Sequence, residues 1–211
     1  MKNKTVAIIP CRSGSQSIRD KNIKKLFGTE LFIHSINFAK KLSFIDEIYC
    51  LTDSNNYAKI ALSNGAKVPY LRSIKTSSNT SMEEDILYEF YNFHKKNKLN
   101  IPKNILWLRP THPLRSINHF KDAYKLYLKS KKSVCVVYKT DSRIFLNKKN
   151  YLIPILSDFK NKSMVRRQDV TSAYKIFSGE IFKMPKKYNK MFLGEKIRFI
   201  ETYDYLNIDI D

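Results

Sequence analysis

Strand-like and helix-like segments alternate along most of this chain, and the alternation limits the folds it can adopt. Short apolar or β-branched runs, typical of buried strands, occur at residues 6–9, 46–52, 67–71, 105–108 and 133–138. Apolar residues recur at helical spacing in the segments between them, at residues 31–42, 54–62, 80–95 and 117–128. This order predicts a three-layer α/β fold, with a mostly parallel sheet covered by helices on both faces. Ligands of such folds bind beyond the carboxyl ends of the strands.

The first strand ends at Pro10 in a loop whose composition suits phosphate binding. Residues 12–22 combine Gly14 and several serines with Arg12, Arg19 and Lys21. Small residues let backbone N–H groups turn toward a ligand, and the cations neutralise it. The loop has neither the Gly-Lys-Ser/Thr of a P-loop nor the GxGxxG of a dinucleotide site, so it indicates an anion site of another kind.

Two further loops follow strands and are expected to meet the first at one cleft. Thr52 and Asp53 come after the second strand, and we expect Asp53 to cap the following helix. Residues 109–115 contain two prolines between Arg109 and Arg115. Alone, this segment is also compatible with a structural turn that carries surface arginines.

The loop after the first strand resembles the nucleotide-binding signature of the acylneuraminate cytidylyltransferases, also called CMP-sialic acid synthetases. That signature reads I-I-P-A-R-x-G-S-K-x-I-P-x-K-N, and it is matched here by Ile8, Ile9, Pro10, Arg12, Gly14, Ser15, Ile18, Lys21 and Asn22. Gln16 replaces a phosphate-facing lysine, and Arg19 is expected to replace its charge in part. The resemblance extends along essentially the whole chain and implies a Rossmann-like nucleotidyltransferase fold.

The resemblance also implies contacts to the nucleotide and the sugar. Nucleotide contacts are implied for Arg12, Gly14, Ser15, Gln16, Asn22, Arg72 and Ser81. Residues 109–115 are similar to the family's Q-P-T-S-P-L-R, which implies sugar contacts from Arg109 and Thr111. Arg109 stands in place of the glutamine, and we expect it to pair with a carboxylate. His112 is equally compatible with a hydrogen-bonding role in the loop and with a ligand.

A third similar segment begins at Val165. Arg166, Arg167, Gln168 and Asp169 match the family's R-R-Q-D, and Ser178 with Gly179 stands where the family has N-G. The resemblance implies that Arg167 and Gln168 reach the substrate phosphates or the sugar, and that Ser178 occupies a sugar-contact position. Taken without the family resemblance, an arginine pair is more typical of a solvated loop.

Two carboxylates alternate at the end of the sequence. On a strand, Asp209 and Asp211 would face the same side. Such a pair suits Mg²⁺, which binds one or two carboxylates together with substrate phosphates. A frayed acidic tail is the alternative. The pair resembles the family's metal-binding aspartates, so we expect a Mg²⁺ cofactor held by Asp209 and Asp211.

Residues 139–165 interrupt the alternation. Two short strand-like runs around Lys148, Lys149 and Asn150 predict a hairpin with a polar tip. A lone hairpin is marginal in water, so something must cover it. We expect residues 1–211 to form one domain, with residues 139–165 as a dimerisation arm of a homodimer.

Composition narrows the functional class. The formal net charge is +20, but the lysines are spread along the chain, which is more typical of a solvated surface than of a nucleic-acid site. No apolar run is long enough to span a membrane, and no secretory signal precedes Val6. Three cysteines with no metal-binding spacing fit reduced, buried thiols. We expect a cytoplasmic protein with neither a membrane nor a nucleic acid as its partner.

The resemblance implies a transferase that activates a 2-keto sugar acid with CTP, giving the CMP-sugar and pyrophosphate, in lipopolysaccharide or capsule biosynthesis. The acid is sialic acid or a related nonulosonic acid. Arg12, Lys21 and Arg167 would hold phosphates. Two alternatives stay open. Gln16 and Ser178 favour a catalytically degenerate nucleotide-binding homologue, and the basic charge favours a nucleic-acid-binding protein.

Overall fold

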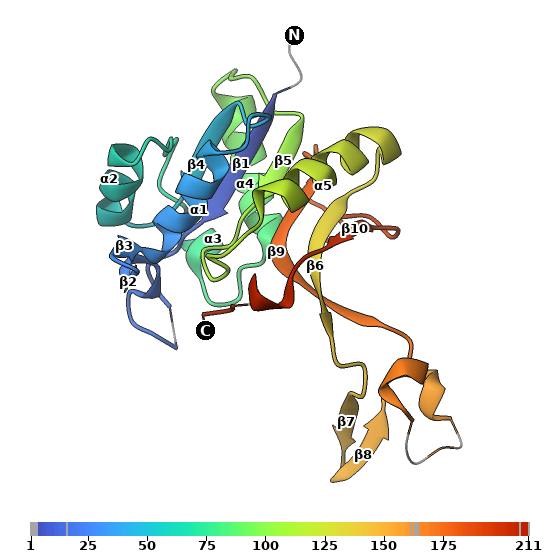
Figure 1. The fold of residues 1–211 in the computed structure, drawn as a ribbon. Helices are drawn as coiled ribbons and strands as arrows, with labels where there is room; N and C mark the ends of the chain where they lie inside the picture. The colour runs from blue at the N-terminus through green and yellow to red at the C-terminus, as the bar shows by residue number, and fades with distance from the viewer. Residues whose placement is uncertain (1–3, 16, 161, 163–164, 207, 211) are drawn as a thin grey trace.

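The computed structural model describes residues 4–15, 17–160, 162, 165–206 and 208–210. A six-stranded sheet lies at its centre (Figure 1). The strand order is β10-β6-β9-β5-β1-β4. These strands are β1 (Thr5–Pro10), β4 (Glu47–Leu51), β5 (Asn104–Trp107), β6 (Val134–Thr140), β9 (Ala173–Lys183) and β10 (Arg198–Glu201). β9 runs antiparallel to both its neighbours, and the other pairs are parallel. The mostly parallel sheet is therefore confirmed.

Helices cover both faces of this sheet. The longer ones are α1 (Leu31–Lys40), α2 (Asn55–Ser63), α4 (Glu83–Lys96) and α5 (Ile117–Ser130). The shorter elements are α3 (Ile74–Ser77), η1 (Lys21–Ile23), η2 (Ser157–Phe159), η3 (Arg167–Asp169), η4 (Asp204–Leu206), β2 (Lys25–Leu26), β3 (Thr29–Glu30), β7 (Phe145–Lys148) and β8 (Tyr151–Pro154).

The alternation of side chains along β1 divides the core into two halves. Ala7 and Ile9 belong to a cluster with residues of α1, α2 and α5. Val6 and Ile8 belong to a second cluster, which contains Phe90 of α4. All four β1 side chains are fully buried, as expected for a central strand with helices on both faces. Because the sheet packs against helices on both faces, the predicted three-layer arrangement is confirmed.

Local signals in the sequence explain where α2 begins and ends. The Oγ of Ser54 accepts a hydrogen bond from the N–H of Tyr57, so Ser54 is the cap. The prediction that Asp53 caps this helix is wrong, because its carboxylate binds Ser13 instead. Gly65 follows the helix with a φ of 77°, a conformation that glycine adopts without strain.

The predicted strand over residues 67–71 is reduced to a single bridge. Lys67 pairs with Tyr49 at the edge of the sheet, and the ladder stops there. Pro69 has no N–H with which to continue it. Instead, the N–H of Arg72 bonds to the carbonyl of Thr52, which carries the chain across the end of β4.

The predicted hairpin is confirmed as an arm that projects from the body of the molecule (Figure 1). β6 and β9 extend past the sheet and lead into β7 and β8. Several apolar side chains of the arm are exposed, among them Leu146 at 49% and Leu152 at 74%. The hairpin alone does not cover this apolar surface.

The three cysteines are free thiols and buried, as expected. None of the helices in the part of the chain that the structure describes is both long and apolar enough to cross a membrane.

His94 makes the stability of the fold depend on pH. The imidazole is buried on α4, its Nδ1 lies 2.9 Å from the carbonyl oxygen of Phe90, and burial lowers its pKa despite this bond and Glu47. The unfolded state, with a pKa of about 6.5, therefore binds more protons below that pH. The contribution of His94 to the free energy of unfolding is therefore fully present above about pH 6.5 and is lost as the pH falls below that value. Urea unfolding midpoints at about pH 7.5 and 5.5 should differ less for His94→Asn than for the native chain or a His34→Asn control. An equal difference in all three would contradict this assignment.

Candidate functional site

A cavity of about 470 Å³ lies at the end of the sheet to which β1 and β5 point. Its walls come from the loop after β1, the start of α4 with the segment before it, and the loop after β5. The lining residues are Pro10, Arg12, Ser15, Lys21, Asn22, Arg72, Ser78, Ser81, Met82, Glu83, Ile86, Trp107, Arg109, Pro110 and Thr111. Loops that follow separate strands therefore meet where the fold predicts a ligand.

The loop after β1 is fixed by side chains on both sides. The carboxylate of Asp53 accepts hydrogen bonds from the backbone N–H and the Oγ of Ser13, at 2.8 and 3.1 Å. The Nδ2 of Asn22 donates to the carbonyl of Arg12 at 2.9 Å. Asp53 and Asn22 thus hold the loop in one shape and position Arg12 at the cavity.

Cationic side chains line the cavity, among them Arg12, Lys21 and Arg72. Arg12 also donates to the Oδ1 of Asn79 at 2.6 Å and so joins the β1 loop to the segment before α4. Burial lowers the pKa of Arg72, while Asp53 and Glu89 act to raise it, so the guanidinium remains charged at neutral pH. These cations suit a polyanionic ligand.

Three buried polar atoms of the cavity wall have no hydrogen-bond partner among the described residues. They are the Nε of Arg72, the Oγ of Ser81 and the Nε1 of Trp107. Buried donors are nearly always paired, so a polar ligand is the natural partner for all three. Trp107 was not among the predicted site residues. A lone tryptophan at the end of a strand was the available signal, because a buried indole N–H needs an acceptor.

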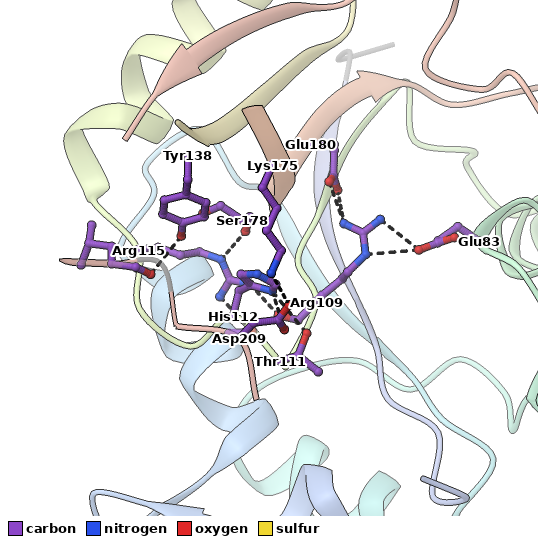
Figure 2. A network of polar contacts seen from close by, with 12 residues as sticks. Glu83, Arg109, Thr111, His112, Arg115, Tyr138, Lys175, Ser178, Glu180 and Asp209 are labelled. Carbon is purple, nitrogen blue, oxygen red and sulfur yellow. Dashed lines mark hydrogen bonds and ion pairs between the residues drawn. The ribbon is translucent and has the colours of Figure 1, made fainter. Parts of the chain in front are cut away.

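Arg109 lies between two carboxylates of the protein (Figure 2). Its Nη1 donates to both oxygens of Glu180, at 2.6 and 2.8 Å. Its Nε and Nη2 donate to the Oε1 of Glu83, at 3.2 and 2.9 Å. Burial acts to lower the pKa of Arg109, but both carboxylates outweigh it and the pKa is raised. Arg109 does pair with carboxylates, as expected, but these are Glu83 and Glu180 of the chain itself and not a group of the substrate.

Arg115 is mostly buried and its guanidinium bonds to groups of the protein, which rules out the alternative of a turn with surface arginines. Its Nε donates to the carbonyl of Ser178 at 2.6 Å, and its Nη2 donates to the carbonyl of Arg109, also at 2.6 Å. A third bond joins its Nη1 to the Oγ of Ser35. Burial lowers the pKa of Arg115 to about 9, which leaves the side chain charged at neutral pH. Arg115 therefore fixes the loop after β5 and does not contact the cavity.

The segment that carries Asp209 runs beside the loop after β5. The N–H of Ile210 donates to the carbonyl of Thr111, a cavity residue, at 3.0 Å. The prediction of a strand here is wrong, because β10 ends at Glu201 and residues 208–210 follow the η4 turn without sheet pairing. The N–H of Ile210 is used by the loop after β5 and not by a neighbouring strand of the sheet.

The Asp209 carboxylate is held by two neighbours (Figure 2). Its Oδ2 accepts from the Nζ of Lys175 at 2.9 Å, and its Oδ1 lies 3.5 Å from the Nδ1 of His112. Burial lowers the pKa of His112 to about 4, although Asp209 acts to raise it, so the imidazole is neutral at pH 7. The described residues contain no group of three or more potential metal ligands. One carboxylate beside the cavity suits Mg²⁺ only when substrate phosphates complete its coordination.

The structure brings most of the predicted site residues together. Those that line the cavity are Arg12, Ser15, Lys21, Asn22, Arg72, Ser81, Arg109 and Thr111. Gly14 lies in the loop after β1 but does not line the cavity. The Arg19 side chain is 98% exposed and near Asp20, so the expectation that it replaces the missing lysine is not supported. Ser178 is buried, its carbonyl accepts from Arg115 and its side chain bonds to Tyr138, so its expected sugar contact is not supported either.

Three predicted residues cannot be placed, and one lies elsewhere. Gln16 and Asp211 fall outside the described residues, as does the side chain of Arg167. Gln168 lies at the base of the arm, in a separate hollow of about 330 Å³ with residues 139–143. Within one chain, Gln168 therefore does not reach the cavity.

A larger groove of about 1140 Å³ runs along the outer side of α4. Its lining contains none of the predicted site residues. Size alone therefore does not mark the site, and the convergence of charged and unpaired groups favours the smaller cavity.

Comparison with known proteins identifies the family of the chain. A family model described as cytidylyltransferase matches residues 6–199. The N-acylneuraminate cytidylyltransferase of Escherichia coli O18:K1:H7 is 32% identical over 163 residues, which cover 77% of this chain and 36% of that protein. The protein of the same description from Streptococcus agalactiae serotype III is 30% identical over 221 residues, covering 99% of this chain and 50% of the relative. The chain thus spans about a third to a half of the length of these relatives.

The fold is also similar to that of a solved structure described as CMP:2-keto-3-deoxy-manno-octonic acid synthetase complexed with CTP. The TM-score is 0.65 at 14% identity, and the match covers 94% of this chain and 90% of that one. At this identity the likeness concerns the fold alone, and it supports the Rossmann-like nucleotidyltransferase architecture.

Proposed function

Since the chain belongs to the cytidylyltransferase family, we propose that it transfers CMP from CTP to a 2-keto sugar acid of the nonulosonic type. The anomeric hydroxyl of the acid attacks the α-phosphorus of CTP, and pyrophosphate leaves. Such a reaction needs positioning and charge neutralisation more than covalent chemistry from the protein. We place it in the cytoplasm, in the synthesis of a lipopolysaccharide or capsule.

The observation that carries the proposal is the make-up of one cavity wall. Arg12 and Lys21 stand beside three buried donors that lack partners among the described residues, on Arg72, Ser81 and Trp107. Phosphate oxygens suit the cations, and the carbonyl and ring nitrogen of cytosine suit isolated donors. CTP contains both kinds of acceptor in one molecule.

Asp209 is the described residue best placed to hold Mg²⁺ against the phosphates. Its neighbour Ile210 is bonded to Thr111 of the cavity wall. When bound, Mg²⁺ would neutralise phosphate charge and lower the pKa of the attacking hydroxyl. The protein's own part is to present the carboxylate, which requires Lys175 to give up its ion pair with Asp209.

Pyrophosphate release tests the proposal directly. The chain should release pyrophosphate when CTP, Mg²⁺ and one acid are combined from a panel of sialic, legionaminic, pseudaminic and octulosonic acids. No release with UTP or with CTP alone is the matched control. Binding of CTP without release for any acid would instead support the degenerate homologue, and preferential binding of duplex nucleic acid at moderate salt would support the third alternative.

We further propose that the arm joins two copies of the chain. β7 and β8 carry exposed apolar side chains: Phe145, Leu146, Tyr151, Leu152 and Ile153. A hairpin with such a surface is stabilised when a second copy covers it. Gln168 lies at the base of this arm, so a second copy would also give it a route to a cavity.

Charge on the arm should separate the two copies. Leu146→Asp combined with Leu152→Asp places carboxylates in the apolar surface, where burial without partners is unfavourable. Sedimentation velocity at micromolar concentration should show a dimer for the native chain and a monomer for this variant. Lys149→Asp, at the exposed tip of the hairpin, should leave the dimer intact. A monomeric native chain would contradict the proposal.

A further inference from the structure

Three charged side chains contact one another in a row, Glu180 to Arg109 to Glu83 (Figure 2). Glu180 lies on β9 in register with Trp107 of β5, and its side chain is 2% exposed. Arg109 follows with a side chain that is 18% exposed, and Glu83, at the first turn of α4, is 28% exposed. Arg109 and Glu83 line the cavity, whereas Glu180 does not. The row therefore has a buried end and an end that faces the ligand.

The buried end fixes the direction in which Arg109 acts. Both oxygens of Glu180 accept hydrogen bonds from the Nη1 of Arg109, so the guanidinium is fixed on the side that faces the sheet. Both oxygens accept from this single nitrogen, and hydrogen bonds between charged groups are shorter and stronger than neutral ones, so the buried carboxylate fixes where Nη1 lies. The Nε and Nη2 of Arg109 both donate to a single oxygen of Glu83. The positive charge of Arg109 is thus largely balanced by carboxylates of the protein.

The exposed end presents a hydrogen-bond acceptor to the cavity. Both bonds from Arg109 reach the Oε1 of Glu83, and its Oε2 accepts no hydrogen bond from any described residue. A carboxylate oxygen accepts hydrogen bonds and cannot donate them when ionised. The wall at Glu83 therefore suits a ligand group that donates, and it repels a ligand carboxylate.

We propose that Glu83 is a specificity-determining residue, whose Oε2 accepts a hydrogen bond from a hydroxyl or acylamino N–H of the sugar acid. Glu180 is a positioning residue that acts through Arg109. This inference rests on the function proposed above and adds to it the kind of substrate group that is read at this wall. It also places the carboxylate of the sugar acid away from Arg109.

Glu83→Gln tests the acceptor role with almost no change of shape. The amide oxygen can still accept from Arg109, so the amide NH₂ then faces the cavity as a donor. The KM for the sugar acid should rise about tenfold or more, because a hydrogen bond to a charged group is lost. The KM for CTP should change less than about twofold, since the same bond is not made to the nucleotide. Glu201→Gln, on the exposed β10 strand, is the control and should change neither constant.

Substrate analogues that lack one donor locate the bond. On the native chain, the deoxy or O-methyl analogue at the recognised position should lose about tenfold in kcat/KM. For Glu83→Gln, this analogue should lose almost no kcat/KM relative to the full substrate, because the accepting carboxylate is already absent. Analogues changed at other positions of the sugar acid should lose as much kcat/KM as they do with the native chain. Glu180→Gln should raise the same KM with little change in kcat, and combining it with Glu83→Gln should add nothing further.

The outcomes separate this inference from the proposed function. If the native chain releases no pyrophosphate with any acid of the panel, the proposed function fails and the inference fails with it. If it does, but Glu83→Gln leaves every analogue's loss unchanged, the inference alone is overturned. A rise in the KM for CTP in place of that for the acid would also overturn it, by assigning Glu83 to the nucleotide. Should Glu180→Gln not fold, the Glu83→Gln series decides the question by itself.

Discussion

Asp209→Asn is expected to reduce Mg²⁺-dependent pyrophosphate release by about a hundredfold or more, the largest effect on activity that we foresee. The substitution keeps the size of the side chain and removes the charge that would hold the metal against the phosphates. CTP binding without Mg²⁺ should stay the same or become slightly tighter, because a charge that repels phosphate is lost. Turnover at several Mg²⁺ concentrations and metal-free CTP titration measure the two quantities.

Lys175→Met is the matched control for this prediction. It breaks the same ion pair with Asp209 but leaves the carboxylate in place. If Asp209 only fastens its segment to the molecule, the two variants should lose activity to a similar degree. If Asp209 is the metal ligand, Lys175→Met should retain most of its turnover. Near-normal activity of Asp209→Asn would show that the metal is held elsewhere.

Arg115→Met is expected to cause the largest loss of stability, about 3–5 kcal/mol of the free energy of unfolding. The guanidinium satisfies the buried carbonyls of Arg109 and Ser178, and methionine leaves both without a donor. Removal of a buried charge offsets part of this cost, because its desolvation penalty also disappears. For a chain of this length the loss corresponds to a fall in Tm of roughly 10 °C.

Arg198→Met provides the comparison for Arg115→Met. Arg198 is an exposed residue of β10, and its replacement should change the free energy of unfolding by less than about 0.5 kcal/mol. Thermal unfolding of the two variants beside the native chain is sufficient. Equal Tm values for Arg115→Met and Arg198→Met would mean that the three hydrogen bonds of Arg115 do not support the loop.

The features that could be predicted from the sequence are those set by local spacing. The alternation of apolar runs predicts the sheet and its covering helices, and the small and basic residues after Pro10 predict the loop that lines the cavity. The hairpin of residues 139–165 follows from its short runs and polar tip. Each depends on residues that are close together in the chain, where periodicity and turn composition act directly.

The features that could not be predicted depend on partners far apart in the chain. Arg109 meets Glu83 and Glu180, which are 26 and 71 positions away, so its pairing within the protein has no local signal. The alternating carboxylates predict a strand around Asp209, but the neighbouring Ile210 bonds to Thr111, which is far away in the chain. Ser54 caps the helix in place of the predicted Asp53, because the carboxylate of Asp53 accepts hydrogen bonds from the N–H and Oγ of Ser13.

The central claim is that the cavity beside the loop after β1 binds the triphosphate of CTP, and calorimetric titration of CTP tests it most directly. Arg12→Ala should weaken binding by about tenfold or more, since a charged hydrogen bond to phosphate is worth roughly 1.5–3 kcal/mol. Its Tm should remain close to that of the native chain. Arg19→Ala changes the same charge in the same loop, but that side chain is 98% exposed and outside the cavity, so its affinity should be unchanged. Equal CTP affinity in the native chain and Arg12→Ala would contradict the account.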